Sequence, residues 1–456
     1  MQWECLERMF EKFEFEFNLI KMNSCRKMRI CVVGAGTAGL AAVKHSLAQD
    51  FDVVCYDKGN AIGGQWVYTD PAGIKCEQNV HSSIYEELRT NVPKEMMAYP
   101  DFEYPSSLKQ SFISATDVLK YHQSYAKHFQ LESHINLNLE VLRIRPSNGR
   151  WQVHVLNTAT KELDVQEFDF VFICNGRFVT PFYASIKDWE QYQGKRLHSH
   201  TYRKAEDFKD ETVLIIGAGR SGMDLTNHIR KTAKHVYLSH HVMPPPRTDF
   251  MPNVTQKPIV QHFTASGAVF SDGSAHDFSV VIYCTGFIYS APFLSADCGL
   301  YVNENAVYPL YKHCININHP TMAFIGLPMY IFSGLSDLQV RFALEYFSGR
   351  KTLPSREEML TEIDAELAER KANGERKWLT HEIHNPKLNN VNYDYNQDLA
   401  DTADIAPIKP VIFKVMENTF NKYLYELDTF RETVYEFVDN ENFIIHPNVD
   451  ALKCKI

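Results

Sequence analysis

Short apolar runs alternate with longer helical patterns over most of the chain, and the clearest unit lies near its start. Residues 29–33 form an apolar run, a glycine-rich turn follows, a helical pattern extends to about residue 48, and residues 51–56 form a second apolar run. Short apolar runs beside turn residues predict buried strands. Strand, turn, helix and strand in this order predict a β-α-β unit with parallel strands.

The same strand, glycine-rich turn and helix return at residues 212–224, followed by an apolar run at 234–239. Residues 355–438 carry many charges in a helical pattern, which predicts a solvated outer layer. The remaining elements that the pattern predicts are helices at 112–129 and from about 336, and strands at 141–144, 151–156, 169–174, 278–284 and 322–326.

Two of the predicted strands end in similar loops, Asn175-Gly176 and Thr285-Gly286. Such loops are where a chain leaves a sheet, so the region between them is predicted to be a compact insertion. The sequence therefore predicts an α/β fold with two Rossmann-like dinucleotide-binding domains, the second inserted into the first. The predicted parts are an N-terminal extension at 1–27, a first domain at 28–180 and 291–456 that includes C-terminal helices, and an inserted domain at 181–290.

The first glycine-rich turn has the spacing G-x-G-x-x-G. Gly34 permits a tight turn, Gly36 removes a side chain that would block a pyrophosphate, and Gly39 lets helix and strand pack closely. Asp57 ends the second strand, where a carboxylate can bind ribose hydroxyls. The complete β-α-β context favours a dinucleotide site over a turn without ligand. The residues predicted to hold this dinucleotide are Gly34, Gly36, Thr37, Ala38, Gly39, Asp57 and Lys58.

The second turn repeats the spacing, but its ribose-binding strand ends in Ser239-His240-His241, with Arg247 shortly after. No carboxylate stands where Asp57 stands in the first unit. Cationic and donor groups favour a 2′-phosphate, so NADPH is expected rather than NADH. Arg247 also fits a solvated loop after three prolines. The residues predicted to hold this cofactor are Gly217, Gly219, Arg220, Ser221, Gly222, His240, His241 and Arg247.

The composition is that of a globular protein with no sign of nucleic-acid binding or of a membrane span. A chain of 456 residues with 45% hydrophobic content can form two or three domain cores, and a net charge of -9 with a pI near 6.1 gives no basic field for nucleic acid. No apolar run reaches the ~18 residues of a membrane span. Residues 1–27 lack the apolar core of a secretory signal.

The ten cysteines show no C-x2-C spacing, and several lie in predicted buried strands. This pattern fits reduced packing cysteines better than disulfides or a metal site. A cytoplasmic location is expected, with peripheral association with the endoplasmic reticulum and homo-oligomerisation left open.

A motif between the two turns resembles the signature F-x-G-x-x-x-H-x-x-x-Y/F of the flavin-containing monooxygenases. It runs from Tyr192 through Gly194 and His198 to Tyr202, with Tyr in place of the opening Phe. Residues 64–66, 90–91, 94–97 and 284–287 also resemble motifs of this family. The resemblance covers nearly everything from residue 28 to about residue 356, and the length is similar to that of its insect and microbial members.

The resemblance implies an enzyme in which NADPH reduces FAD, oxygen forms a C4a-hydroperoxyflavin, and a soft nitrogen or sulfur nucleophile is oxygenated. It places FAD in the first domain and NADPH in the insertion, and it gives Asn91 the catalytic role of holding the intermediate and oxygen. The partners it implies are molecular oxygen and a small amine or sulfide, as in xenobiotic metabolism. The resemblance also implies that further residues bind the cofactor on the flavin side, namely Gly64, Gln65, Trp66, Thr90, Val92 and Gln339.

Taken by themselves, Trp66 fits a core residue and Asn91 a turn residue. Arg220 stands where the family usually has a small residue or Asn, and Ser239-His240-His241 replaces an arginine-bearing segment.

A disulfide reductase would need a C-x2-C or C-x4-C pair, which the sequence lacks. An idle flavoprotein is disfavoured by the two intact turns and Asn91. An NADPH oxidase that releases hydrogen peroxide stays open, and a Baeyer–Villiger monooxygenase has a different ending to its signature.

Overall fold

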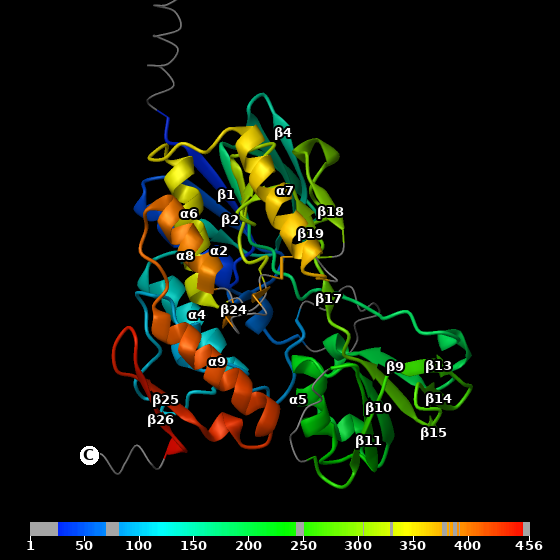
Figure 1. Cartoon of the computed structure of the whole chain (residues 1–456). Helices are drawn as coiled ribbons and strands as arrows, with labels where there is room; N and C mark the ends of the chain where they lie inside the picture. The colour runs from blue at the N-terminus through cyan, green and yellow to red at the C-terminus, as the bar shows by residue number, and fades with distance from the viewer. Residues whose placement is uncertain are drawn as a thin grey trace, which may run out of the picture.

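The chain forms a larger and a smaller lobe in the computed structural model (Figure 1). The described residues are 26–69, 82–242, 250–303, 305–328, 332–375, 381–382, 384–385, 390–391 and 393–449. The predicted extension at 1–27 therefore lies almost wholly outside them. Along the described parts of the chain, no helix is both long and apolar enough to cross a membrane.

The larger lobe is built on a seven-stranded sheet in the order β20-β21-β22-β7-β1-β2-β3. Its centre is parallel, with β1 between β2 and β7, as the predicted β-α-β unit requires. Helix α2 (Thr37–Ala48) connects β1 to β2. The strands are β1 (Arg29–Val33), β2 (Asp52–Tyr56), β3 (Ile135–Asn136), β7 (Phe170–Ile173), β20 (Leu310–Tyr311), β21 (Ile315–Asn316) and β22 (Met322–Phe324).

The smaller lobe, green in Figure 1, holds a five-stranded parallel sheet in the order β12-β11-β10-β16-β9. Helix α5 (Arg220–Ile229) follows β10, which repeats the arrangement of the first unit. The chain leaves the first sheet after β7, builds this second sheet, and returns to the first at β20. The strands are β9 (Lys195–His198), β10 (Thr212–Ile216), β11 (His235–Ser239), β12 (Val254–Lys257) and β16 (Val280–Tyr283). The predicted fold of two Rossmann-like units is confirmed.

Short antiparallel sheets complete the two lobes. They are β4-β5-β6 (Leu139–Ser147, Arg150–Asn157, Leu163–Phe168), β13-β14-β15 (Val260–Phe263, Gly267–Phe270, Ala275–Asp277), β8-β17 (Thr180–Pro181, Phe287–Ile288), β18-β19 (Tyr301–Asn303, Ala306–Tyr308), β23-β24 (His384–Asn385, Asn390–Val391) and β25-β26 (Val434–Phe437, Phe443–His446). The pair β8-β17 lies where the chain passes between the lobes (Figure 1).

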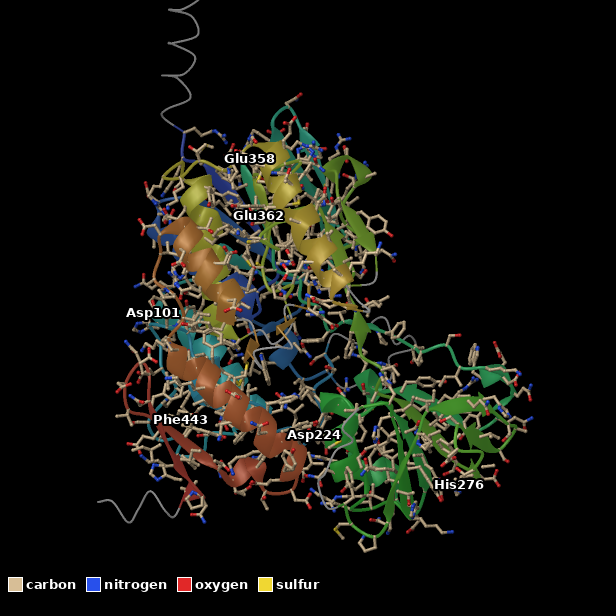
Figure 2. All side chains as sticks on the ribbon, in the orientation of Figure 1. Asp101, Asp224, His276, Glu358, Glu362 and Phe443 are labelled. Atoms are coloured by element: carbon tan, nitrogen blue, oxygen red, sulfur yellow. The ribbon has the colours of Figure 1, made fainter. Side chains whose placement is uncertain are left out.

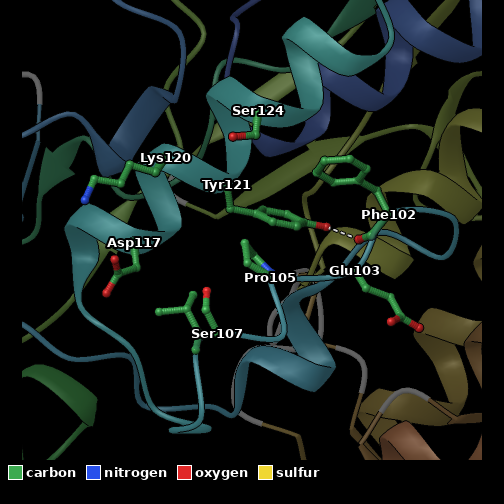
Figure 3. Close-up of a pocket in the computed structure, with 9 residues that line it drawn as sticks. Phe102, Glu103, Pro105, Ser107, Asp117, Lys120, Tyr121 and Ser124 are labelled. Atoms are coloured by element: carbon green, nitrogen blue, oxygen red, sulfur yellow. Dashed lines mark hydrogen bonds between the residues drawn. The ribbon is translucent and has the colours of Figure 1, made fainter.

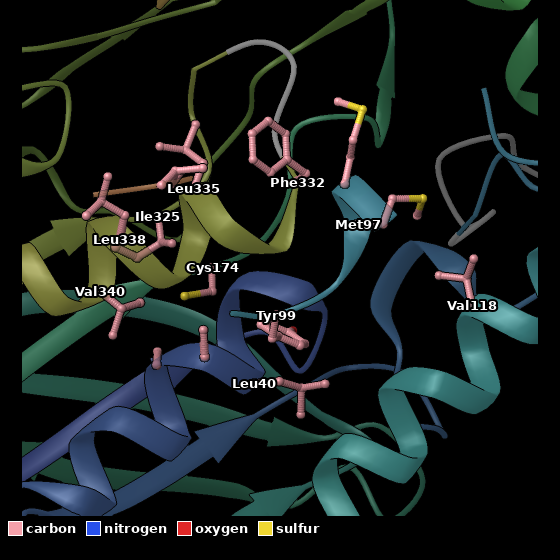
Figure 4. Packing of buried hydrophobic residues seen from close by; sticks show 14 of the residues in the cluster. Leu40, Met97, Tyr99, Val118, Cys174, Ile325, Phe332, Leu335, Leu338 and Val340 are labelled. Carbon is pink, nitrogen blue, oxygen red and sulfur yellow. The ribbon is translucent and has the colours of Figure 1, made fainter. Parts of the chain in front are cut away.

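Helices α2 and α6 (Ser333–Phe347) cover the first sheet and pack against each other. Leu40 of α2, Leu335 and Leu338 of α6 and Cys174 after β7 belong to one buried cluster (Figure 4). Full burial of one such leucine contributes roughly 2 kcal/mol to stability. Helix α4 (Ala115–His128) buries Tyr121 and Tyr125, as the predicted core face at 112–129 requires.

The prediction of a solvated layer at 355–438 is wrong for its second half. Helix α7 (Arg356–Ala372) is mostly exposed, but α8 (Tyr393–Ala403) and α9 (Pro410–Tyr425) bury a full apolar side. On α9 the buried residues are Val411, Phe413, Val415, Met416, Thr419 and Tyr423. Charges on the outer faces of these helices mask the apolar stripe, which packs into the main core.

Candidate dinucleotide sites

Both glycine-rich turns are closed so tightly that the outer glycines admit no side chain. Gly34 has a φ of +105°, and a Cβ there would lie 2.5 Å from the carbonyl oxygen of Cys174. A Cβ on Gly39 would lie 1.8 Å from the carbonyl oxygen of Gly34. The second turn has the same features: Gly217 has a φ of +106°, and a Cβ on Gly222 would lie 1.7 Å from the carbonyl oxygen of Gly217. These are the roles that the spacing predicts for the first and third glycines.

The middle glycines border space at the start of each helix. In the first turn, Gly36 faces Gly64, and a Cβ on Gly64 would lie 2.8 Å from the Cα of Gly36. Gly64 also has a φ of +55°, which favours glycine. In the second turn, a Cβ on Gly219 would have no heavy atom within 4 Å. The absence of a side chain at Gly36 and Gly219 thus allows a close approach to the backbone at the start of each helix, which suits a phosphate group.

Asp57 lies at the end of β2, as predicted, and is 7% exposed. Its two carboxylate oxygens accept hydrogen bonds from the backbone N–H groups of Ala35 and Gly59, each at 2.7 Å. Each oxygen keeps a further lone pair, so the carboxylate can still accept from a hydroxyl group. Its neighbour Lys58 is exposed.

Thr37 and the half-buried Ala38 begin helix α2 beside the first turn. The Thr37 hydroxyl forms a 3.0 Å hydrogen bond with Nε2 of His122 on α4, and the Tyr99 hydroxyl donates to the Thr37 carbonyl at 2.6 Å. Burial lowers the pKa of His122 to about 4, so its ring is neutral near pH 7. The His122 contact fixes α4 against the start of α2, and the Tyr99 contact fixes residue 99 there.

The flavin-side residues that the resemblance implies have different surroundings. Gln65 is exposed and donates to the Ser83 hydroxyl at 2.9 Å, and Trp66 packs half-buried on the core, which fits its alternative role. Val92 also packs on this core. Gln339 is fully buried, and its amide is bonded at both ends, accepting from the Gly326 N–H at 2.9 Å and donating to the Tyr395 hydroxyl at 2.8 Å.

Asn91 follows a tightly held residue. Thr90 is 3% exposed; its N–H donates to the Ile113 carbonyl at 2.9 Å, and its hydroxyl accepts from the Ile113 N–H at 3.2 Å. Its carbonyl accepts from Nε of Arg431 at 3.0 Å. Asn91 itself is half-buried, and its amide makes no hydrogen bond to any described residue. The backbone is fixed while the amide remains available.

The start of α5 is covered by helix α9. The guanidinium of Arg220 lies 4.4 Å from the centre of the Tyr423 ring, and the Tyr423 hydroxyl donates to the Gly219 and Arg220 carbonyls at 3.5 and 3.4 Å. Arg220 thus packs on an aromatic face. Ser221 is half-buried beside it.

Directly after β11, the His240 ring contacts its own loop and the neighbouring strand β12. Its Nδ1 accepts from the Val242 N–H at 3.3 Å, and its Nε2 lies 2.9 Å from Oε1 of Gln256. His241 is exposed and forms no hydrogen bond to a described residue. Arg247 lies outside the described residues. Of the two histidines, His241 is the better placed to meet a ligand.

The signature motif forms part of the core of the smaller lobe. The Tyr192 hydroxyl donates to the Phe278 carbonyl at 2.9 Å, and a Cβ on Gly194 would lie 2.1 Å from that hydroxyl. His198 is fully buried, and its pKa falls to about 4 because of that burial. Tyr202 is 1% exposed and packs edge-on against Tyr85. The side chains of the motif that match the signature, Tyr192, His198 and Tyr202, are therefore buried.

A separate pocket of about 280 Å³ lies between α4 and the loop at 102–108 (Figure 3). Glu103, Asp117 and Lys120 give it a polar rim, and the Tyr121 hydroxyl donates to the Phe102 carbonyl at 2.5 Å beside it. None of the predicted site residues lines it.

Comparison with known families identifies the family of proteins to which the chain belongs. A family model described as flavin-binding monooxygenase-like matches residues 27–243 and 245–421. The chain belongs to the flavin-binding monooxygenase family. This flavin-binding monooxygenase is an oxidoreductase that uses FAD and NADPH, as the resemblance implied.

Its relatives span nearly its whole length. Senecionine N-oxygenase of Tyria jacobaeae is 35% identical over 437 residues, covering 91% of each chain. Flavin-containing monooxygenase FMO GS-OX5 of Arabidopsis thaliana is 31% identical over 448 residues, covering 94% of this chain and 95% of its own. The structure of S-allyl-L-cysteine S-oxygenase from Allium sativum superposes with a TM-score of 0.83 at 27% identity, covering 94% of this chain and 98% of its own.

Proposed function

We propose that this monooxygenase binds FAD at the turn of Gly34–Gly39 and NADPH at the turn of Gly217–Gly222, and that it oxygenates small amines or sulfides. The observation that carries the assignment is the difference between the strand ends beyond the two turns. Asp57 directly follows β2, whereas β11 ends at Ser239 and His240 follows it, without a carboxylate. A carboxylate repels a 2′-phosphate, so the second site suits NADPH.

The two kinds of nucleophile are supported by relatives of both types. Senecionine N-oxygenase is named for oxygenation at nitrogen, and S-allyl-L-cysteine S-oxygenase for oxygenation at sulfur. Both atoms carry a polarisable lone pair that can accept an electrophilic oxygen atom. We therefore expect a tertiary amine and a thioether to be substrates of this enzyme.

When bound, FAD takes a hydride from NADPH and then activates molecular oxygen. The protein has to orient the cofactors and keep water and stray protons away from the reacting group. Asn91 suits the orienting role because an amide both donates and accepts, and its amide makes no hydrogen bond to the described residues. The buried Thr90 fixes the backbone from which that amide extends.

The test measures product, NADPH consumption and hydrogen peroxide in the same reaction, with N,N-dimethylaniline and thioanisole as probes. We expect one oxygenated product for each NADPH consumed, and weaker turnover with NADH. In Asn91→Ala, product formation is expected to fall by about 10²-fold, as when one oriented polar group is removed from an active site. The melting temperature should stay close to that of the wild type, because the Asn91 amide makes no hydrogen bond to the described protein.

Peroxide without product in the wild-type protein would contradict the proposed function and favour an NADPH oxidase. Asn91→Asp is the matched variant, since it keeps the side-chain size but removes the donor. If both variants form product as fast as the wild type, Asn91 has no catalytic role.

We also propose a reducing compartment such as the cytoplasm for this protein. The described cysteines, at positions 31, 55, 174, 284, 298 and 314, are all free and buried, which supports that location.

A further inference from the structure

A buried ion pair joins the smaller lobe to the C-terminal segment. Asp224 on α5 is 7% exposed, Arg431 in the turn after α9 is 9% exposed, and Nη1 of Arg431 lies 2.7 Å from Oδ1 of Asp224. The Tyr85 hydroxyl donates to the other oxygen of Asp224. Figure 2 shows Asp224 at the boundary between α5 and the C-terminal helix. A buried charge pair of this kind is costly to break from one side.

The same guanidinium also holds the backbone beside Asn91. Nε of Arg431 donates to the Thr90 carbonyl at 3.0 Å, while Nη1 engages Asp224. A second hydrogen bond joins the same two segments, since Nη2 of Arg89 donates to the Arg431 carbonyl at 2.9 Å. One planar group therefore joins α5, which begins at the second glycine-rich turn, to the residue before Asn91.

Other contacts keep the C-terminal segment on α5 but do not reach residues 85–91. Nη2 of Arg230 lies 2.6 Å from Oδ1 of Asp428, and Tyr423 bonds to the backbone at the start of α5. The side chain of Arg230 is 8% exposed and that of Arg431 is 10% exposed. Arg230 thus provides a comparison of equal burial that lacks the link to Thr90.

We propose that Arg431 is a positioning residue, which sets the Asn91 amide by tying the Thr90 carbonyl to Asp224 of the inserted domain. The link couples the order of residues 89–92 to the state of α5, so a dinucleotide at the second turn and the loop at Asn91 stabilise each other. This inference rests on the proposed roles of Asn91 and of the second turn. Arginine is required because its fork serves two acceptors at once, whereas a lysine ammonium is a point charge.

The experiment compares Arg431→Met, Arg431→Lys, Arg230→Met and the wild type as purified flavin-loaded proteins. The first readout is hydrogen–deuterium exchange of the peptide spanning 85–92, with and without NADP⁺. The second is the fraction of consumed NADPH that appears as peroxide when thioanisole is present. Arg431→Lys keeps the positive charge beside Asp224, so the same measurements can be made on this variant if Arg431→Met does not fold.

We expect exchange in peptide 85–92 to rise by about tenfold or more in both Arg431 variants, as when a hydrogen bond to a charged group is lost. NADP⁺ should slow this exchange in the wild type and in Arg230→Met but not in Arg431→Met. The peroxide fraction should rise only in the Arg431 variants.

Wild-type exchange in the Arg431 variants, or an equal rise in Arg230→Met, would overturn the inference. Failure of the proposed function would appear differently, as a wild-type protein that forms no sulfoxide. The exchange comparison would still decide the role of Arg431 in that case.

Discussion

At the scale of single residues, the glycines of the second turn differ in what surrounds them. A Cβ on Gly219 would meet no heavy atom within 4 Å, whereas one on Gly222 would lie 1.7 Å from the Gly217 carbonyl oxygen. The φ of Gly219 is -74°, which alanine also adopts. Substitution of Gly219 therefore tests ligand binding, whereas substitution of Gly222 tests the stability of the fold.

Gly219→Ala is expected to change the free energy of unfolding by less than about 1 kcal/mol and to raise the Kd for NADP⁺ by at least about tenfold. The added methyl group would occupy the approach to the N-terminus of α5. Gly222→Ala should instead destabilise the protein by about 3 kcal/mol or more, because backbone must move. Denaturant unfolding and titration calorimetry measure the two effects. Wild-type NADP⁺ affinity in Gly219→Ala would remove the second turn from the cofactor site.

The residues in the turns could be predicted because their spacing is local in sequence. Gly34, Gly39 and Asp57 occupy the positions that the pattern predicts. Arg431 could not be predicted in this way, since its partners Thr90 and Asp224 lie hundreds of residues away and no short motif connects them. Gln339 was implied by resemblance alone, and the sequence gives no sign that its amide is bonded at both ends.

At the scale of elements, α4 is fixed to the first turn through a histidine that has to stay neutral. Burial lowers the pKa of His122 from 6.5 to about 4 in the folded protein. The unfolded chain therefore binds a proton near pH 6.5 that the folded chain binds only near pH 4. The stability that depends on the neutral ring is complete above pH 6.5 and is lost as the pH falls toward 4.

We expect the free energy of unfolding to fall by up to about 3 kcal/mol from this group between pH 6.5 and pH 4. His122→Gln removes the titrating ring, so its stability should depend less steeply on pH over that range. His198 adds a similar dependence in both proteins, since its pKa is also lowered to about 4 by burial. Denaturant unfolding at a series of pH values measures the slopes. Equal slopes would show that His122 is not buried in the neutral form.

Helix α9 shows where pattern analysis fails at this scale. Its buried residues include Val411, Val415 and Thr419, whose spacing does follow one helical face. The charged and exposed α7 dominates the same stretch of sequence and gives it a solvated character. The surfaces that α9 covers come from other parts of the chain, including Gly219 and Arg220, so only the folded chain brings them together.

At the scale of the whole molecule, a β-α-β unit is used twice and the second copy lies between β7 and β20 of the first sheet. The similar loops at Asn175-Gly176 and Thr285-Gly286 predicted this path, because each follows a buried strand. The contact between the lobes includes the buried pair of Asp224 and Arg431. Charges in that position are paired because an isolated buried charge is strongly unfavourable.

Oxygen transfer from O₂ to the substrate is tested most directly by turnover of thioanisole by the flavin-loaded enzyme with NADPH under oxygen gas labelled with ¹⁸O. We expect a sulfoxide that carries one labelled oxygen atom, formed at one molecule per NADPH consumed. Unlabelled sulfoxide, or labelled hydrogen peroxide with no sulfoxide, would contradict it.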